Sequence, residues 1–470
     1  MGTLNGRSMT LETAAKTEEA GDQIPPGGAL GTAQIAGHRD AFDAEPRNRV
    51  AQNAVTRTAI DEVAVNREVV TSTDHTFSHL LDQWAVTDQK QSGRCWLFAG
   101  MNLFRVGAME QMGLKGFEFS QTYLFFWDKF ERANYFLEAM IETSDRPVDD
   151  RVVAWLLDHP VDDGGQWNMF ASLVDKYGLA PKSVMPETVS SERTMPMNRH
   201  LVERLREGAR DIRGLRETGS SLDALRDSKN ATLDQVFRIL SIHLGTPPER
   251  FDWQWNDKDD TFHRDGELTP QDFAQKYVDV PFDDYVCLVN DPRPGSPYGR
   301  TFTVEYLGNV VGGEPVRYLN VEIDVMKELT MRSIAERGEP VWMGCDVGKM
   351  MQRDLGIWDA KMFDYGSLYG ADFDLDKSDR LRYHQTFMTH AMLFTGVDVV
   401  DGAPRRWRVE NSWGDKHGRK GFYAMNDSWF DEHMFEVAVR REDLPADLQA
   451  ALAQEPIVLP PWDPMGALAG

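Results

Sequence analysis

Runs of apolar residues predict two buried helices in the first half of the chain. The stretch over residues 95–106, which opens Cys-Trp-Leu-Phe-Ala-Gly-Met-Asn, follows a polar, turn-forming segment that ends at Gly93. It is apolar nearly all round, which is typical of a buried central helix. The stretch over residues 120–130, Ser-Gln-Thr-Tyr-Leu-Phe-Phe-Trp-Asp-Lys-Phe, predicts a second helix with an aromatic core face.

The spacing of apolar positions changes within the middle of the chain. Residues 195–245 repeat their apolar positions every 3.6 residues and predict helices, on the evidence of Met197, Leu201, Leu205, Ile212 and Leu215. Thr232 followed by Gln235 forms a capping-box pattern and predicts a helix start there. Residues 282–325 contain short β-branched runs between turn signals, which predicts strands.

The later part of the chain reads as β-rich. Residues 384–426 predict strands around His390, Val409 and Phe422, and the apolar stretch over residues 341–345 predicts another. We therefore expect an α+β protein with five segments, which in chain order are a flexible N-terminal tail (1–40), an N-terminal arm and helical lobe (41–190), a helical insertion (191–280), a β-rich lobe (281–455) and a C-terminal arm (456–470).

Length and composition narrow the class of protein. A chain of 470 residues is too long for one ordinary core, and 41% hydrophobic residues is usual for a globular protein. No apolar run is long enough to cross a bilayer, and the first residues lack the apolar core of a secretory signal, so we expect no membrane association. A net charge of −24 argues against a nucleic-acid surface. Three cysteines cannot build a disulfide framework, which fits the cytoplasm.

Cys95 is the candidate nucleophile, because it stands where the first buried helix begins. Unsatisfied backbone N–H groups and the helix dipole favour an anion at that end, so the position predicts a lowered thiol pKa. Cys287 and Cys345 lie within predicted strands and are expected to be buried structural thiols.

Two later stretches supply partners for that thiol. His390 lies in a β-like apolar segment and would act as general base and acid. Asn411 follows a strand and would orient the imidazole, with Trp413 shielding their hydrogen bond from water. Gln89, six residues before Cys95, could point a side-chain N–H at the oxyanion.

Five separated segments carry a family resemblance. In chain order they are Gln-Lys-Gln-Ser-Gly-Arg-Cys-Trp-Leu-Phe (89–98), Gly-Gly-Gln-Trp (164–167), Thr-His-Ala-Met (389–392), Glu-Asn-Ser-Trp-Gly (410–414) and Pro-Trp-Asp-Pro-Met-Gly-Ala-Leu-Ala (461–469). From about Asn53 to its last residue, the chain resembles the bleomycin hydrolase and aminopeptidase C branch of the papain-like cysteine peptidases. The resemblance implies a two-lobed papain-like fold, with a helical lobe, a β-barrel-like lobe and a large helical insertion.

The resemblance also implies how substrate binds. Gly164 and Gly165 would lie beside the cleft and offer backbone hydrogen bonds to a peptide, since paired glycines allow close backbone approach. Trp413 would belong to the same cleft. The chain end, Ala469 and Gly470, would lie in the cleft and match its carboxylate to the substrate's α-ammonium group, which favours an aminopeptidase.

The implied activity is removal of N-terminal residues from peptides with a free N-terminus, through a thioester on Cys95. No metal and no cofactor are implied. A homo-oligomer, a hexamer by family analogy, is expected, and bleomycin amide and thiolactone hydrolysis are carried over by the same analogy.

His384 is a rival base, but it precedes the strand and lacks the apolar surroundings, so His390 is the preferred base. Two alternative functions stay open at this level. The same Cys-His-Asn set could serve an acyl or amide transferase, which passes the acyl group to an amine instead of water. A non-catalytic assembly protein is the alternative from another class.

Overall fold

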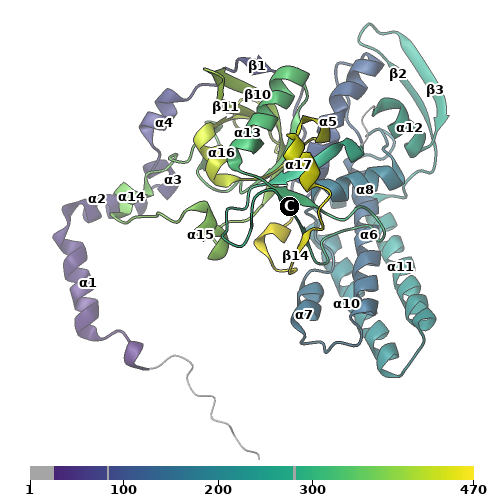
Figure 1. The fold of residues 1–470 in the computed structure, drawn as a ribbon, viewed down its shortest axis with the longest axis horizontal. Coiled ribbons are helices and arrows are strands. Elements are labelled where there is room, and N and C mark those ends of the chain that lie inside the picture. The colour runs from purple at the N-terminus through teal and green to yellow at the C-terminus, as the bar shows by residue number, and fades with distance from the viewer. Residues whose placement is uncertain (1–25, 82–83, 279–281, 470) are drawn as a thin grey trace, which may run out of the picture.

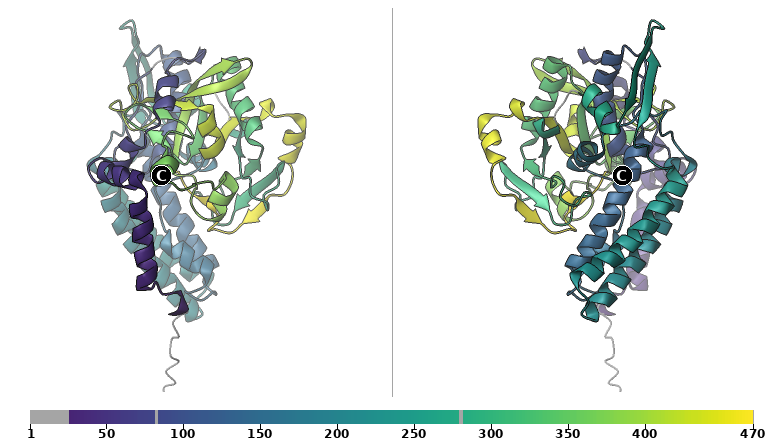
Figure 2. Two further views of the ribbon diagram at one scale, coloured as in Figure 1. Left: turned by 90° about the vertical axis from the view of Figure 1, so that its left-hand side faces the viewer. Right: turned by 90° about the vertical axis from the view of Figure 1, so that its right-hand side faces the viewer.

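The computed structural model describes residues 26–81, 84–278 and 282–469, and it places them in two lobes that lie side by side (Figures 1 and 2). One lobe is built from helices of the first half of the chain and the other from a large sheet of the second half. The predicted α+β class is therefore confirmed.

The helical lobe begins with the two predicted apolar helices. Its helices are α5 (Cys95–Met112), α6 (Gln121–Glu142), α7 (Arg151–Asp158), α8 (Trp167–Tyr177), α9 (Val189–Glu192), α10 (Met195–Glu217), α11 (Leu222–Leu244) and α12 (Pro270–Tyr277). α6, α10 and α11 run alongside one another as a bundle (Figure 1). α5 is buried along most of its length, as its all-round apolar surface predicts.

Two predictions for the middle of the chain need correction. α11 starts ten residues before Thr232, with the Ser221 side chain accepting from the backbone N–H of Ala224. Thr232 lies inside the helix, where its hydroxyl donates to the Ser228 carbonyl 3.1 Å away and makes no capping interaction. The range predicted as a helical insertion also contains an antiparallel hairpin of β2 (Phe251–Asn256) and β3 (Phe262–Leu268).

Twelve strands form one sheet in the described part of the chain. They are β1 (His79–Leu80), β4 (Tyr285–Val289), β5 (Arg300–Val304), β6 (Tyr318–Asn320), β7 (Val341–Cys345), β8 (Met351–Gln352), β9 (Ile357–Trp358), β10 (His390–Val400), β11 (Ala403–Glu410), β12 (Phe422–Asn426), β13 (Met434–Arg440) and β14 (Ile457–Leu459). The order is β14-β5-β6-β4-β13-β7-β10-β11-β12-β9-β8, with β1 beside β10. β10 is thus central, and the head of α5 packs against it.

Register brings the two lobes' functional segments together. His390 is the first residue of β10 and pairs with Cys345 of β7. Alternate residues of β10 face opposite sides of the sheet. Ala391 and Leu393 belong to the core that contains Cys95, whereas Met392 and Phe394 belong to the core inside the β-rich lobe. The start of β10 is therefore part of the interface between the two lobes.

The β-rich lobe also carries short helices, namely α13 (Ile323–Arg332), α14 (Tyr365–Tyr369), α15 (Lys377–Arg382), α16 (Asp427–His433) and α17 (Ala446–Ala451). The N-terminal region forms α1 (Thr32–Ala44), α2 (Pro46–Val55), α3 (Ile60–Val63) and α4 (Arg67–Ser72). None of the described helices has the length and apolar character needed to cross a bilayer.

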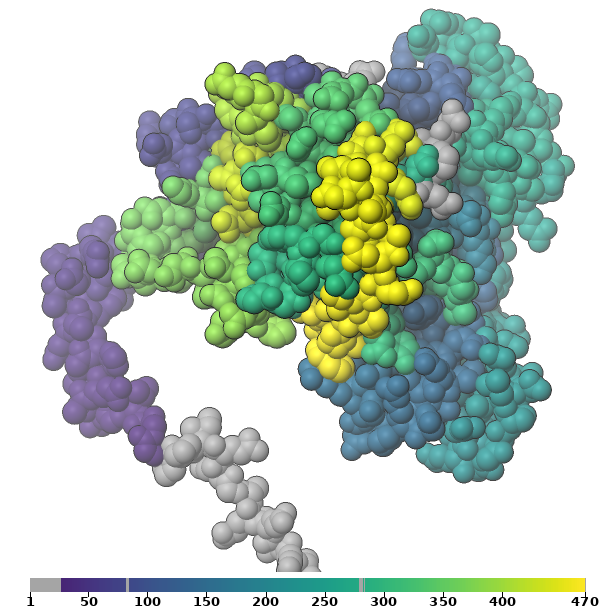
Figure 3. Space-filling model, viewed as in Figure 1, coloured from purple at the N-terminus to yellow at the C-terminus, as the bar shows by residue number. Residues whose placement is uncertain are grey.

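The two ends of the chain differ. Residues 1–25 of the predicted tail lie outside the described residues, but Thr32–Ala44 form α1, a helix with no buried side chain that projects from the body (Figure 1). The C-terminal segment 456–469 runs over the surface between the two lobes, as the yellow atoms in Figure 3 show. Ala469, at its end, is fully buried.

Candidate active site

Cys95 is the first residue of α5 and is fully buried. Its Sγ atom lies 3.3 Å from the backbone nitrogen of Ala391, the residue after His390. The head of one buried helix and the start of the central strand therefore meet at this sulfur, although 296 positions of sequence separate them.

The hydrogen bonds of Asn411 define the tautomer of His390. Asn411 Oδ1 accepts from the backbone N–H of Ser412 at 2.7 Å, and a backbone N–H can only donate, so the side-chain amide has one orientation. The same Oδ1 lies 2.9 Å from His390 Nε2, which must then carry the proton. His390 Nδ1 is left with its lone pair.

Burial dominates the acid–base properties of both groups. It raises the pKa of the Cys95 thiol to about 12, against the lowering effect of hydrogen bonds from the backbone N–H groups of Ala391, Trp96 and Cys95 itself. It lowers the pKa of His390 to about 4, and the bond to Asn411 opposes that shift. The lowered thiol pKa predicted from the helix start is therefore wrong for this closed site, because desolvation outweighs the helix N-terminus.

Gln89 is buried next to the same two segments. Its backbone N–H donates to the Ser412 carbonyl at 2.8 Å, and its Oε1 accepts from the Ser412 hydroxyl at 2.6 Å. Its side-chain Nε2 donates to the Ser92 carbonyl, which leaves a second N–H on the same nitrogen. The amide is thus fixed beside the segment that leads into Cys95.

Trp413 covers the imidazole. The ring centroids of His390 and Trp413 lie 4.9 Å apart, with an interplanar angle of 33°. The guanidinium of Arg353 lies over the Trp413 ring, 5.0 Å from its centroid. His384, the rival base, lies instead on the wall of a different pocket from the one that His390 lines.

The glycine pair lies against the C-terminal segment. The Gly165 N–H donates to the Ala469 carbonyl at 3.0 Å, and the Ala469 N–H donates back to the Gly165 carbonyl at 3.3 Å. A Cβ on Gly165 would lie 2.5 Å from the Trp96 ring, and one on Gly164 would lie 2.7 Å from the Ala469 oxygen. Only glycine fits between the helix and this paired strand. Gly470 lies outside the described residues.

Buried charges that sequence reasoning missed hold this segment in place. Lys129 of α6 pairs with Asp163 at 2.6 Å, and Asp163 also accepts from Asn198 at 2.6 Å. The pKa of Asp163 is held well below its usual range, because these donors outweigh its burial. Arg132 donates to the Gly164 carbonyl. The sequence did contain a signal for this network. Lys129 and Arg132 lie three residues apart in an aromatic helix, and Asp-Asp stands just before the glycine pair.

A second buried network joins the lobes through the helix that begins at Cys95. Glu410, the last residue of β11, is 2% exposed and accepts from Asn102 Nδ2 and from Arg105, each at 3.0 Å. The Trp84 indole N–H donates to the same carboxylate at 2.5 Å. Asn102 and Arg105 belong to the helix headed by Cys95, and Glu410 precedes Asn411. This network therefore fixes the thiol's helix relative to the asparagine.

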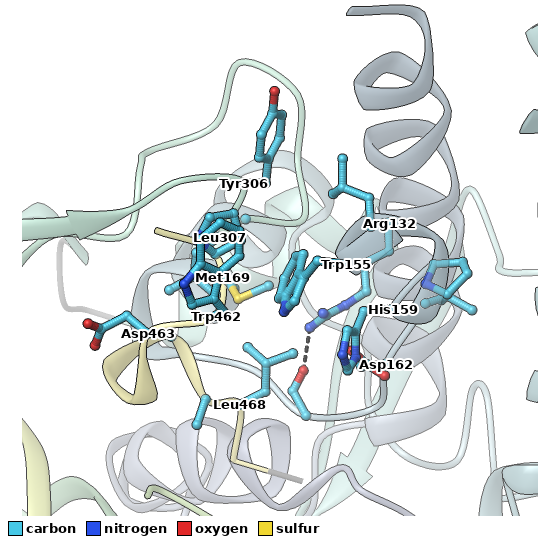
Figure 4. Close-up of a pocket in the computed structure, with 18 of the residues that line it drawn as sticks. Arg132, Trp155, His159, Asp162, Met169, Tyr306, Leu307, Trp462, Asp463 and Leu468 are labelled. Atoms are coloured by element: carbon cyan, nitrogen blue, oxygen red, sulfur yellow. Dashed lines mark hydrogen bonds and ion pairs between the residues drawn. The ribbon is translucent and has the colours of Figure 1, made fainter. Parts of the chain in front are cut away.

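A cavity of about 520 Å³ continues the cleft beyond the C-terminal segment. Trp155, His159 and Asp162 come from α7 and the loop after it, and Trp462 and Leu468 come from the C-terminal segment (Figure 4). The dashed line in the figure is the bond from Arg132 to the Gly164 carbonyl. The C-terminal segment thus forms part of the wall of this largely apolar cavity.

Within the described residues, no group of three or more His, Cys, Asp or Glu side chains is arranged to hold a metal ion. All three cysteines are free and buried. Burial raises the pKa values of Cys287 and Cys345 well above the usual range, and among the described residues neither thiol makes a hydrogen bond with a histidine side chain.

Comparison with known proteins gives a consistent result. Residues 29–466 match the model of the peptidase C1-like family. Aminopeptidase C of Lactobacillus delbrueckii subsp. lactis is 43% identical over 427 residues, which cover 90% of this chain and 95% of that relative. Human bleomycin hydrolase is 42% identical over 450 residues, which cover 94% of this chain and 99% of that relative.

A solved structure agrees with these relatives. PepW from Lactobacillus rhamnosis HN001 aligns with a TM-score of 0.92 and 45% identity, over 94% of this chain and all of that one. The predicted resemblance and the papain-like fold are confirmed by these matches. The chain belongs to the peptidase C1-like family.

Proposed function

We propose that this protein is a cysteine aminopeptidase that removes N-terminal residues from peptides through a thioester on Cys95. The observation that carries the proposal is the two-way backbone pairing of Gly165 with Ala469. The protein's own C-terminal segment occupies the edge where residues upstream of a cleaved bond would pair. A peptide can then place only its first residues next to the sulfur.

In the proposed reaction, His390 Nδ1 takes the thiol proton as Cys95 Sγ attacks the carbonyl carbon. The second N–H of Gln89 and the Cys95 backbone N–H stabilise the oxyanion. The imidazolium then gives its proton to the leaving amine, and the thioester remains on the sulfur. Water, deprotonated by His390, hydrolyses the thioester and restores the thiol. Asn411 keeps the ring in one orientation throughout, with Trp413 over their bond.

Relatives named aminopeptidase C and bleomycin hydrolase support peptide substrates with a free N-terminus. We further propose a cytoplasmic homo-oligomer, a hexamer by family analogy. Light scattering coupled to size-exclusion chromatography measures the number of subunits. A monomeric mass would contradict the proposed homo-oligomer.

The test is the Cys95→Ala variant with a fluorogenic aminoacyl substrate. We expect the loss of at least about 10³-fold in kcat/KM, since the nucleophile is removed. Cys287→Ala, at another buried thiol, is the matched control and should keep its activity. The N-acetylated form of the same substrate should be refused by the unchanged protein. Continued release of the fluorophore by Cys95→Ala would refute the assignment.

A further inference from the structure

A second hollow, of about 550 Å³, opens beside His390. We call it the leaving-side pocket, and it is lined by Gln89, Gln91, Ser92, Gly93, Thr194, Asp346, Val347, Gly348, Lys349, Thr389, His390 and Trp413. No described residue of the C-terminal segment 456–469 contributes to it. If the N-terminal end of a substrate lies toward Ala469, the part that is released must lie in this pocket.

The leaving-side pocket contains a cation without an ion-pair partner. Lys349 is half-buried on its wall, and no described carboxylate oxygen lies within 4.0 Å of its ammonium group. Arg353, four residues later, lies over Trp413 and likewise makes no ion pair with a described residue. In a chain of net charge −24, a cation without an ion-pair partner on the wall that also holds His390 favours a negatively charged group on the leaving side.

The pocket's own acid does not take up this charge. Asp346 is 3% exposed, and its carboxylate accepts from the Thr386 hydroxyl at 2.7 Å and from the Thr389 hydroxyl at 3.4 Å. Burial raises its pKa, and Lys349 lowers it only from a distance. Asp346 thus uses its oxygens within the protein, and Lys349 remains available to a ligand.

We propose that Lys349 is a specificity-determining residue that selects peptides with a carboxylate immediately after the cleaved bond. This inference rests on the proposed aminopeptidase function. The carboxylate can come from two sources: the C-terminal carboxylate of a dipeptide, or the side chain of an Asp or Glu as the second residue. Both would place one negative charge in the leaving-side pocket.

Two matched substrate pairs separate the sources. Met-Ala is compared with Met-Ala-amide, and Met-Glu-Ala-amide is compared with Met-Gln-Ala-amide. We expect kcat/KM to favour the carboxylate member by about three- to tenfold in at least one pair, as for a half-buried charge pair. Raising the salt concentration should reduce the preference, because the pocket is open to solvent.

Variants of Lys349 test its role through the ratio of the two kcat/KM values within each substrate pair. Lys349→Ala should abolish the preference, and Lys349→Glu should reverse it toward the uncharged member. Lys361→Glu, at an exposed lysine of the same lobe, makes the same change in net charge and should keep the ratio.

Equal ratios in the unchanged protein and in both Lys349 variants would overturn the inference. A fluorogenic aminoacyl amide without any carboxylate tests the proposed function separately. If the unchanged protein fails to cleave that substrate, the aminopeptidase assignment fails; if it cleaves it without a carboxylate preference, only the role of Lys349 fails.

Discussion

At the scale of residues, the molecule contains a buried acid that the proposed reaction does not use. Glu436 of β13 is 1% exposed, and neither carboxylate oxygen has a hydrogen-bond partner among the described residues. The nearby Cys287 thiol donates to Asn168 Oδ1, 3.4 Å away, and its proximity lowers the pKa of Glu436 by less than burial raises it. Burial raises the pKa of Glu436 to about 8, so the side chain is held as the neutral acid at neutral pH.

This residue predicts a pH-dependent stability. Glu436 keeps its proton in the folded state between its ordinary pKa of 4.5 and about 8, whereas the unfolded chain releases it. The contribution of Glu436 to the free energy of unfolding is therefore fully present below its ordinary pKa of 4.5. It is lost as the pH rises toward the pKa of about 8 in the folded state, by about 1.4 kcal/mol per pH unit. We expect Glu436→Gln to become progressively more stable than the unchanged protein from pH 5 to pH 8, measured by urea unfolding.

Glu455→Gln, at an exposed glutamate, is the control and should not change the pH profile. A constant difference between Glu436→Gln and the unchanged protein at every pH would contradict the buried, protonated acid.

At the scale of elements, the C-terminal segment is held at several points along its length. Arg293 makes a bidentate pair with Asp463 at 2.8 and 3.1 Å, and the Arg151 guanidinium lies 3.7 Å from the Trp462 ring centroid. Gln166 Nε2 donates to the Ala467 carbonyl at 2.6 Å, just before the pairing of Ala469. The segment is therefore a built part of the cleft, although it has little regular structure.

Removing residues 467–470 should change the position of cleavage. We expect the shortened protein to cleave N-acetylated peptides and internal bonds, because Gly165 is then free to pair with residues upstream of the bond. The products are identified by mass spectrometry. Replacing Ala467 by Ser keeps the backbone bonds and should leave the release of single N-terminal residues intact. Continued refusal of blocked peptides by the shortened protein would show that another element limits the cleft.

At the scale of the whole molecule, the two lobes are joined by charges that are almost completely buried. Arg105 and Glu410 are 3% and 2% exposed, and their pair spans the lobes beside the catalytic candidates. Burial lowers the pKa of Arg105 and raises that of Glu410, and each charge opposes the shift of the other. Such a pair is costly to break, because one buried charge is left without its partner.

Arg105→Met should destabilise the protein by about 3–5 kcal/mol. The apparent midpoint of urea unfolding measures it, at fixed protein concentration because an oligomer's stability depends on concentration. Arg264→Met removes the cation of an exposed pair with Asp252 on the hairpin and should cost less than about 1 kcal/mol. Adding Glu410→Gln to Arg105→Met should recover part of the loss. Similar midpoints for the Arg105 and Arg264 variants would contradict the buried network.

The sequence by itself determined the elements that present the chemistry. The apolar run from residue 95 could only be a buried helix with Cys95 at its start, and the later segments place His390 in a strand and Asn411 just after one. These are local properties, because periodicity and turn residues act over a few positions. The start of α11 was misjudged for the same local reason: the hydroxyl of Thr232 has two possible partners, and the pattern alone does not choose between them.

Only the tertiary structure decided the environment of those residues. The direction of the Cys95 pKa depends on complete burial between two lobes, which no local pattern encodes. The same holds for the pairing of Gly165 with Ala469, for the neutral Glu436 and for Lys349, which has no ion-pair partner among the described residues. Desolvation and charge pairing depend on which distant segments meet, and here they join positions up to about three hundred residues apart.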